Sequence, residues 1–300
     1  MKRLKGVVCA TITPMLEDGS VDFESLRSLV RYLNKVGIHC LYPNGTNGES
    51  LSLTKEERER IAEVIVEENK TATVYIQCGA SSVTESYSHV RHAKACGADG
   101  AGLMTPVFFP VDSEGMRIYY ETILDEIRDF PIYVYNIFTR TGNDVPVALL
   151  GSLMDRYENL YGIKFSYPDV LRIRDYANAP KERRADALIG CDLLAKNCCA
   201  KGGAGWVSGP AAVYGKLHTA LYDAIVAENE EDAVKWQKAI TEQMAAIAKI
   251  PEIPAIKYML KKLGVIANDT CRAPFRPLNA DEKARLDAAL EAYVNTYGEA

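Results

Sequence analysis

The feature that most constrains this chain is a regular alternation of short apolar runs with amphipathic segments. Eight runs have the length and composition of strands, at residues 6–13, 38–44, 72–80, 97–106, 131–137, 160–166, 185–191 and 203–209. Successive parallel strands need a crossover connection, which is usually a helix. Eight such units in 300 residues favour a closed barrel over an open doubly wound sheet. We therefore predict an α/β fold, the (β/α)8 TIM barrel.

The segments between these runs carry helix signals. Apolar residues recur at helical spacing from Phe23 to Leu33, and Gly37 follows as a stop signal. Thr54, with Glu57 three residues later, has the pattern of a capping box. The helices that a barrel requires are therefore indicated independently of the strands.

The chain changes character after the eighth run. Residues 230–249, 254–264 and 279–298 read as three helices without intervening strands. No linker is long enough to separate them as an independent domain. We predict a barrel over residues 1–229 and a C-terminal three-helix extension over residues 230–300 that packs on it.

Charge and hydropathy exclude two classes of partner. A formal net charge of −5 gives no electrostatic case for binding nucleic acid or an anionic membrane. No apolar run approaches the roughly 18 residues of a membrane helix. The basic start is followed by a short apolar stretch that runs into Thr13 and Pro14, which we interpret as a first strand rather than a signal peptide. We expect a cytoplasmic protein.

The cysteines and histidines do not indicate a metal centre. The eight cysteines are scattered without a C-x-x-C pair, and several fall in predicted strands, where a thiol behaves as a small hydrophobe. Only His89 and His92 have a spacing that could suit zinc, and we interpret that pair as a solvated helix face. We expect a reduced protein with no metal and no cofactor.

One charged residue interrupts an apolar run. Lys164 lies within residues 160–166, although an unpaired buried charge is costly. Either its amine reaches water at the end of the strand, or the amine is neutral and nucleophilic. In a barrel of this kind the active site lies at the carboxyl ends of the strands, which is where Lys164 is predicted to stand.

The other polar groups predicted at this end of the barrel favour the nucleophilic alternative. A neutral lysine attacks a ketone to form a Schiff base, and the iminium then permits formation of an enamine that adds to an aldehyde. The phenol of Tyr135 can relay the protons. The turn from Gly45 to Gly48 offers N–H donors and a hydroxyl that suit a small carboxylate. A 2-keto acid is therefore a natural Schiff-base partner.

The chain resembles the dihydrodipicolinate synthase / N-acetylneuraminate lyase family of pyruvate-dependent class I aldolases over nearly its full length. The resemblance is carried by "ATITPMLEDGSVD", "GTNGES", "YNIFTRTG", "GIKFS" and "RAPFRPL", in that order. It implies that Lys164 is the Schiff-base lysine and Tyr135 the proton-shuttling phenol. It also implies that Thr46, a further catalytic candidate, holds the pyruvate carboxylate together with Asn47, and that the chain forms a homotetramer.

The motifs differ on which member of the family this is. Arg140 matches the arginine with which the synthases bind the carboxylate of their aldehyde, so 4-hydroxy-tetrahydrodipicolinate synthase, acting on pyruvate and aspartate semialdehyde, is the nearest activity. Phe108 stands where a synthase has a tyrosine, and Asn47 replaces a hydroxyl residue. N-acetylneuraminate lyase, a 2-keto-3-deoxy sugar-acid aldolase or dehydratase, and a non-catalytic 2-keto-acid binding protein remain alternatives. Val207 is expected in the pocket wall.

Overall fold

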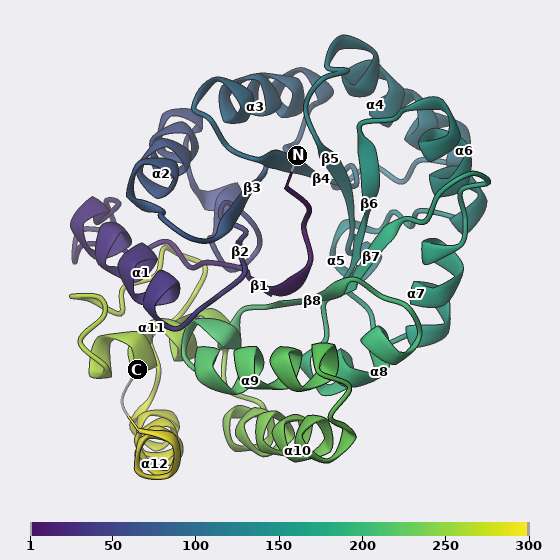
Figure 1. Cartoon of the computed structure of the whole chain (residues 1–300). Coiled ribbons are helices and arrows are strands. Elements are labelled where there is room, and N and C mark those ends of the chain that lie inside the picture. The colour runs from purple at the N-terminus through teal and green to yellow at the C-terminus, as the bar shows by residue number, and fades with distance from the viewer. Residues whose placement is uncertain (1, 299–300) are drawn as a thin grey trace. The chain divides into compact units, whose positions relative to one another are not determined.

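The eight strands form a closed barrel in sequence order (Figure 1). The computed structural model describes residues 2–298. Its strands are β1 (Gly6–Cys9), β2 (Cys40–Leu41), β3 (Thr73–Gln77), β4 (Gly100–Met104), β5 (Ile132–Asn136), β6 (Leu160–Phe165), β7 (Asp186–Ile189) and β8 (Gly205–Ser208). Each lies within one of the eight predicted runs. The predicted (β/α)8 barrel is confirmed.

Helices follow the strands and continue beyond the last one. They are α1 (Phe23–Lys35), α2 (Lys55–Glu68), α3 (Val83–Ala95), α4 (Ser113–Glu126), α5 (Phe138–Thr141), α6 (Val147–Arg156), α7 (Val170–Ala177), α8 (Ala195–Ala200), α9 (Gly215–Val226), α10 (Glu230–Ile247), α11 (Glu252–Lys262) and α12 (Ala280–Tyr297). The three predicted C-terminal helices correspond to the last three of these.

The helix signals act as the sequence indicates. The Thr54 side chain accepts a hydrogen bond from the Glu57 N–H, and the Glu57 carboxylate accepts one from the Thr54 N–H. This reciprocal capping box satisfies two N–H groups that a helix start leaves without partners. Gly97 lies just beyond α3 with φ of 86°, a left-handed conformation that glycine adopts without a steric penalty.

The chain divides into two compact units. The first contains the start of the chain up to Gly6 and Thr73–Val207. The second contains Val7–Ala72 and the chain from Ser208 onward, so it joins early and late parts of the sequence. Within it, α9 and α10 pack side by side (Figure 1). The boundary that the sequence indicates near residue 230 stays a prediction.

A polar cluster occupies the amino ends of the strands in the first unit. The Tyr133 hydroxyl on β5 donates to the Asp186 carboxylate on β7 at 2.6 Å, and Arg3 pairs with the same carboxylate at 2.9 Å. The Tyr75 ring on β3 packs edge-on against Tyr133. These side chains fill the amino end, as expected of a barrel whose interior is packed.

Close contact between β6 and β7 depends on one glycine. A Cβ on Gly162 would lie 1.9 Å from the carbonyl oxygen of Asp186, far inside any real contact. Only glycine lets the two backbones approach in this way. Gly162 lies two residues before Lys164, so this contact also fixes the strand that carries the candidate nucleophile.

Two further expectations can be compared with the described residues. None of the helices within residues 2–298 combines the length and apolar character needed to cross a bilayer. His89 is buried at 4% exposure, so the prediction of a solvated face was wrong for this residue. His89 lies on the buried face of α3 together with Ser86, Val90 and Ala93.

Candidate active site

Lys164 and Tyr135 are brought together by neighbouring strands. Their Cα atoms are register partners between β6 and β5, and Lys164 Nζ lies 3.9 Å from the centroid of the Tyr135 ring. The exposed fractions are 5% for Lys164 and 1% for Tyr135. An amine that simply extended to water at a strand end would be exposed. The buried position is the one that the nucleophilic alternative requires.

Aromatic side chains surround the loops that follow these two strands. Phe165, next to Lys164, is fully buried, and its ring stacks on that of Phe138 with centroids 6.2 Å apart. The ring of Tyr167 lies 4.9 Å from that of Phe138, and this tyrosine is partly exposed. Because successive side chains of a strand point to opposite faces, Phe165 and the rings that pack on it lie on the face of β6 away from the Lys164 side chain.

A partly buried polar network fixes the end of β5. The amide of Asn136, which follows Tyr135, donates to the Asp144 carboxylate at 2.7 Å and to the Tyr176 hydroxyl at 3.1 Å. Arg172 donates to the other oxygen of Asp144 at 2.7 Å. Burial raises the pKa of Tyr176 to about 12, so this phenol stays protonated. The network holds the backbone next to the Tyr135 phenol in one position.

Arg140 lies in α5, a single turn directly after β5, and its side chain is exposed. The Thr141 and Thr105 hydroxyls lie 2.7 Å apart in a buried contact, and Gly142 ends the turn with φ of 79°. Arg140 is therefore carried on a firmly held loop at the carboxyl end of a barrel strand, the end where TIM-barrel sites form.

Phe108 has a backbone conformation that is unusual for a bulky residue. Its φ is 75°, in the left-handed region that is uncommon for side chains other than glycine and asparagine. The ring is 86% exposed. The Asn143 amide holds this loop by donating to the carbonyls of Pro106 and Phe109 at 2.8 and 2.9 Å. As a phenylalanine where a synthase has a tyrosine, Phe108 offers no hydroxyl.

Val207 lies on β8 and is 5% exposed. Strand β8 pairs with β7, and β7 pairs with β6, so Val207 and Lys164 belong to the same run of adjacent strands in the first unit. The contribution of Val207 to a pocket wall stays a prediction.

Thr46 and Asn47 lie in the second unit, in a turn after β2 that we call the β2 turn (residues 45–49). Both are half-buried. The Glu49 N–H donates to the Thr46 carbonyl at 3.1 Å, which closes the turn. The Asn47 amide donates to Glu252 of α11 at 2.8 Å. Because that side chain is engaged by Glu252, the Asn47 donor expected to serve a ligand carboxylate is its backbone N–H.

A buried ion pair beside this turn was not anticipated. Glu49 binds Lys257 of α11, and both side chains have no exposed surface. Lys257 also donates to the carbonyl of Thr270 at 2.7 Å. The signal in the sequence was the same as for Lys164: a lysine within an apolar stretch, here Ile253–Leu260.

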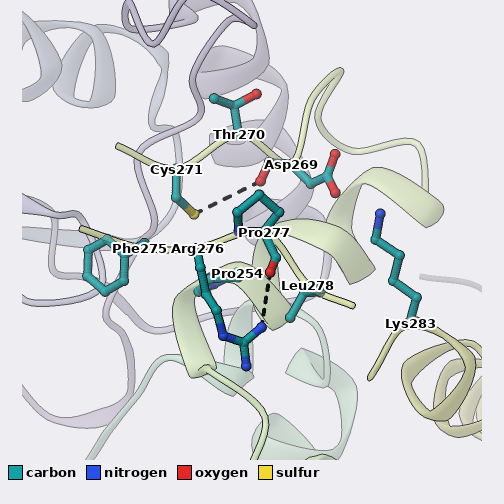
Figure 2. Close-up of a pocket in the computed structure, with 9 residues that line it drawn as sticks. All are labelled: Pro254, Asp269, Thr270, Cys271, Phe275, Arg276, Pro277, Leu278 and Lys283. Carbon is teal, nitrogen blue, oxygen red and sulfur yellow. Dashed lines mark hydrogen bonds between the residues drawn. The ribbon is translucent and has the colours of Figure 1, made fainter. Parts of the chain in front are cut away.

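A cavity of about 300 Å³ lies apart from the predicted site residues (Figure 2). It is lined by Pro254, Asp269, Thr270, Cys271, Phe275, Arg276, Pro277, Leu278 and Lys283. None of the candidate residues is among them. Within residues 2–298, we find no cluster of three or more His, Cys, Asp and Glu side chains that could hold a metal ion.

Comparison with known proteins gives full-length matches. The model of the dihydrodipicolinate synthetase family matches residues 3–293. An uncharacterized DapA-like lyase of Halobacterium salinarum is 33% identical over 96% of this chain and 93% of its own. A 4-hydroxy-tetrahydrodipicolinate synthase of Bartonella bacilliformis is also 33% identical, over 96% and 97%.

Solved structures agree with this chain over the same extent. The dihydrodipicolinate synthase of Aquifex aeolicus is 27% identical with a TM-score of 0.91, covering 97% of this chain and 98% of its own. YagE of Escherichia coli K12, a prophage protein of the dihydrodipicolinic acid synthase family solved with pyruvate, is 25% identical with a TM-score of 0.91, over 97% and 99%. A monomeric dihydrodipicolinate synthase variant is 27% identical with a TM-score of 0.88, over 96% of each chain.

Proposed function

Because this chain belongs to the dihydrodipicolinate synthetase family, whose members are lyases of the class I aldolase type, we propose that it binds pyruvate covalently on Lys164. The observation that carries the proposal is the contact between a buried amine and a buried phenol ring, 3.9 Å apart on paired strands. Amine and phenol are the two groups that Schiff-base chemistry needs side by side.

In the proposed reaction, the neutral Lys164 amine adds to the ketone carbon of pyruvate to give a carbinolamine. Tyr135 donates the proton with which the hydroxyl leaves as water, and an iminium remains. Loss of a proton from the pyruvate methyl group gives an enamine, which forms a carbon–carbon bond to an aldehyde. Hydrolysis of the product iminium returns the free lysine, and the reverse sequence cleaves the same bond.

The pyruvate carboxylate is assigned to the β2 turn. Thr46 supplies a hydroxyl, and the backbone N–H groups of Thr46 and Asn47 supply further donors of the kind that bind small anions. The family resemblance of "GTNGES" supports this assignment. Val207 would form part of the wall around the bound substrate. The chemistry uses no metal or separate cofactor, since the iminium formed between Lys164 and the ketone provides the electron sink.

The second substrate is proposed to be an aldehyde that carries a carboxylate. Arg140 is exposed on the loop after β5, and a guanidinium binds a carboxylate through two parallel hydrogen bonds. Aspartate semialdehyde meets this requirement, which makes 4-hydroxy-tetrahydrodipicolinate synthase the nearest activity. Phe108 lacks the hydroxyl of a synthase proton relay. The segments "FFPVDSE" and "KFS" favour as second candidate a lyase acting on N-acetylneuraminate or a 2-keto-3-deoxy sugar acid.

The central test is reductive trapping. Pyruvate and borohydride should leave one reduced pyruvyl group on Lys164, located by peptide mass spectrometry, and none on the buried Lys257. Lys164→Arg should abolish the adduct.

Loss of pyruvate in a coupled assay with aspartate semialdehyde, N-acetylmannosamine, glyceraldehyde or glyoxylate then identifies the acceptor. Absence of an adduct on Lys164 would contradict the proposal, and an adduct without turnover on any acceptor would favour a 2-keto-acid binding protein.

We further propose that the protein works in the cytoplasm as a homotetramer. The family resemblance supports both, although the monomeric variant among the similar structures shows that assembly varies between relatives. Light scattering coupled to size-exclusion chromatography measures the mass directly. A mass of one chain at micromolar concentration would contradict the tetramer.

A further inference from the structure

The β2 turn is held by polar groups of α11 and of the segment that follows α11. One carboxylate oxygen of Glu49 accepts a hydrogen bond from Lys257 Nζ, and the other accepts one from the Arg272 N–H at 3.0 Å. The neighbouring Asn47 amide donates to Glu252. Two of the five residues of the turn are therefore tied to α11, and one of these also to the segment after α11.

The backbone of the turn needs this support. Asn44, which directly precedes the turn, and Glu49, at its end, have φ of 58° and 56°, in the left-handed region where glutamate is uncommon. The Asn44 amide is held by the carbonyl of Arg58 at 2.9 Å. The Glu49 side chain branches from the backbone at the end of the turn. Anchoring its buried carboxylate therefore also restricts the backbone conformation of Glu49. Strained residues of this kind persist only where the surroundings over-determine them.

We propose that Lys257, through Glu49, is a positioning residue for recognition of the substrate carboxylate. The inference rests on the proposed function, in which the β2 turn binds pyruvate. Lys257 fixes the Glu49 carboxylate, Glu49 fixes the end of the turn, and the turn presents the Thr46 and Asn47 N–H groups in one direction. Neither Lys257 nor Glu49 touches the substrate.

The ionic character of this contact argues for a role beyond stability. A well-packed apolar pair of similar volume is often as stabilising as a buried ion pair. It would not accept the Arg272 N–H, and it would leave the direction of the Glu49 side chain to packing alone. Donors that recognise an anion depend on orientation to within a fraction of an ångström. A geometric requirement of this kind distinguishes the ion pair from an apolar replacement.

The test compares two ketones, one with a carboxylate and one in which that carboxylate is masked as a neutral methyl ester. Borohydride trapping on Lys164 is measured against the concentration of pyruvate and of methyl pyruvate, whose ester has no carboxylate to be recognised. In Lys257→Met and Glu49→Gln, half-saturation for pyruvate should rise by about tenfold or more, as expected when hydrogen bonds to a charged group are lost. Half-saturation for methyl pyruvate should stay within about twofold, because the lysine itself is intact.

Two controls separate positioning from folding. The double variant Glu49→Leu/Lys257→Met replaces the pair by apolar side chains, and it should recover the melting temperature without recovering the preference for pyruvate. Arg276 forms a bidentate pair with Glu282 away from the turn, and Figure 2 shows its guanidinium at the carbonyl of Pro277. Arg276→Gln should leave both half-saturation values unchanged.

The outcomes distinguish the two proposals. If the wild-type protein forms the adduct and the variants keep its preference for pyruvate, the positioning role is wrong and the Schiff-base function stands. A parallel rise for both ketones, or recovery of the preference in the apolar double variant, also overturns the positioning role, because the pair then acts only on stability. Absence of an adduct in the wild-type protein overturns the function and the inference together.

Discussion

Tyr135 and Lys164 are partners on adjacent strands of the barrel, with the lysine nitrogen 3.9 Å from the centre of the tyrosine ring. Backbone pairing between β5 and β6 sets this relationship, and no flexible loop intervenes. A pair of side chains placed on strands is held more precisely than one on loops. The effect of this placement on activity can be measured by substituting either residue.

Tyr135→Phe removes the hydroxyl and keeps the ring. We expect kcat with pyruvate and its acceptor to fall by about 10²- to 10⁴-fold, the usual contribution of a general acid–base group. The melting temperature should change little, since the ring still fills its site. Stopped-flow trapping with borohydride should show the adduct forming more slowly on Lys164. A kcat equal to that of the wild type would assign the proton transfers to another group.

Gly162→Ala should strongly destabilise the folded protein. The new methyl group would meet the Asp186 carbonyl at 1.9 Å, so β6 and β7 would have to separate next to Lys164. Overpacking of this severity costs about 3 kcal/mol or more. Gly115→Ala is the matched control, because its Cβ would meet nothing closer than 3.3 Å. Urea denaturation of the two variants measures the difference, and equal midpoints would contradict the expectation.

Much of this fold was readable from local patterns. The strand-like runs and the Thr54 capping box depend on neighbours in the sequence, and the structure has β1–β8 and the start of α2 where these signals lie. Lys164 stood out because a charge within an apolar strand requires an explanation. Its proximity to Tyr135 followed from barrel topology, in which consecutive strands are adjacent.

The contacts that could not be predicted are those that join distant segments. Nothing near Glu49 in the sequence indicates that its partner is Lys257, 208 residues later. The engagement of Asn47 by Glu252 is hidden for the same reason. The burial of His89 was missed because helix periodicity assigns a face without revealing how much of it the neighbouring elements cover.

Arg140→Ala should lower kcat/KM for aspartate semialdehyde by about 10- to 100-fold, the loss expected when hydrogen bonds to a charged group disappear. The formation of the pyruvate adduct on Lys164 should be unaffected. Arg140→Lys should recover little, since an ammonium cannot reproduce the bidentate geometry. Indifference of kcat/KM to the alanine substitution would remove the main reason for assigning a carboxylate-bearing aldehyde.

His218 should contribute to acid sensitivity. Burial lowers its pKa to about 3, so the folded protein keeps it neutral, whereas the unfolded chain protonates it below about pH 6.5. Between these values the unfolded state binds the extra proton, and stability falls with falling pH by up to about 1.4 kcal/mol per pH unit from this residue. Above pH 6.5 both states are neutral and the contribution is constant.

The measurement is the free energy of unfolding as a function of pH in wild type and His218→Gln. The variant should show a shallower decline from pH 6.5 downward. His92→Gln, at a half-buried position of α3, serves as the control and should follow the wild-type curve. If the free energy of unfolding falls equally with pH in the wild type and in His218→Gln, the His218 imidazole does not cause the loss of stability at low pH.

The pairing of Glu49 with Lys257 can form only late in the synthesis of the chain. The ribosome completes the glutamate 208 residues before the lysine, and the second unit consists of the early and late parts of the chain. Until α11 emerges, burying that carboxylate is strongly unfavourable, so we expect the nascent loop to stay hydrated and its backbone N–H groups to stay unaligned. Under the proposed role, an incompletely translated chain cannot bind pyruvate through the β2 turn. Activity then begins only when translation is almost finished.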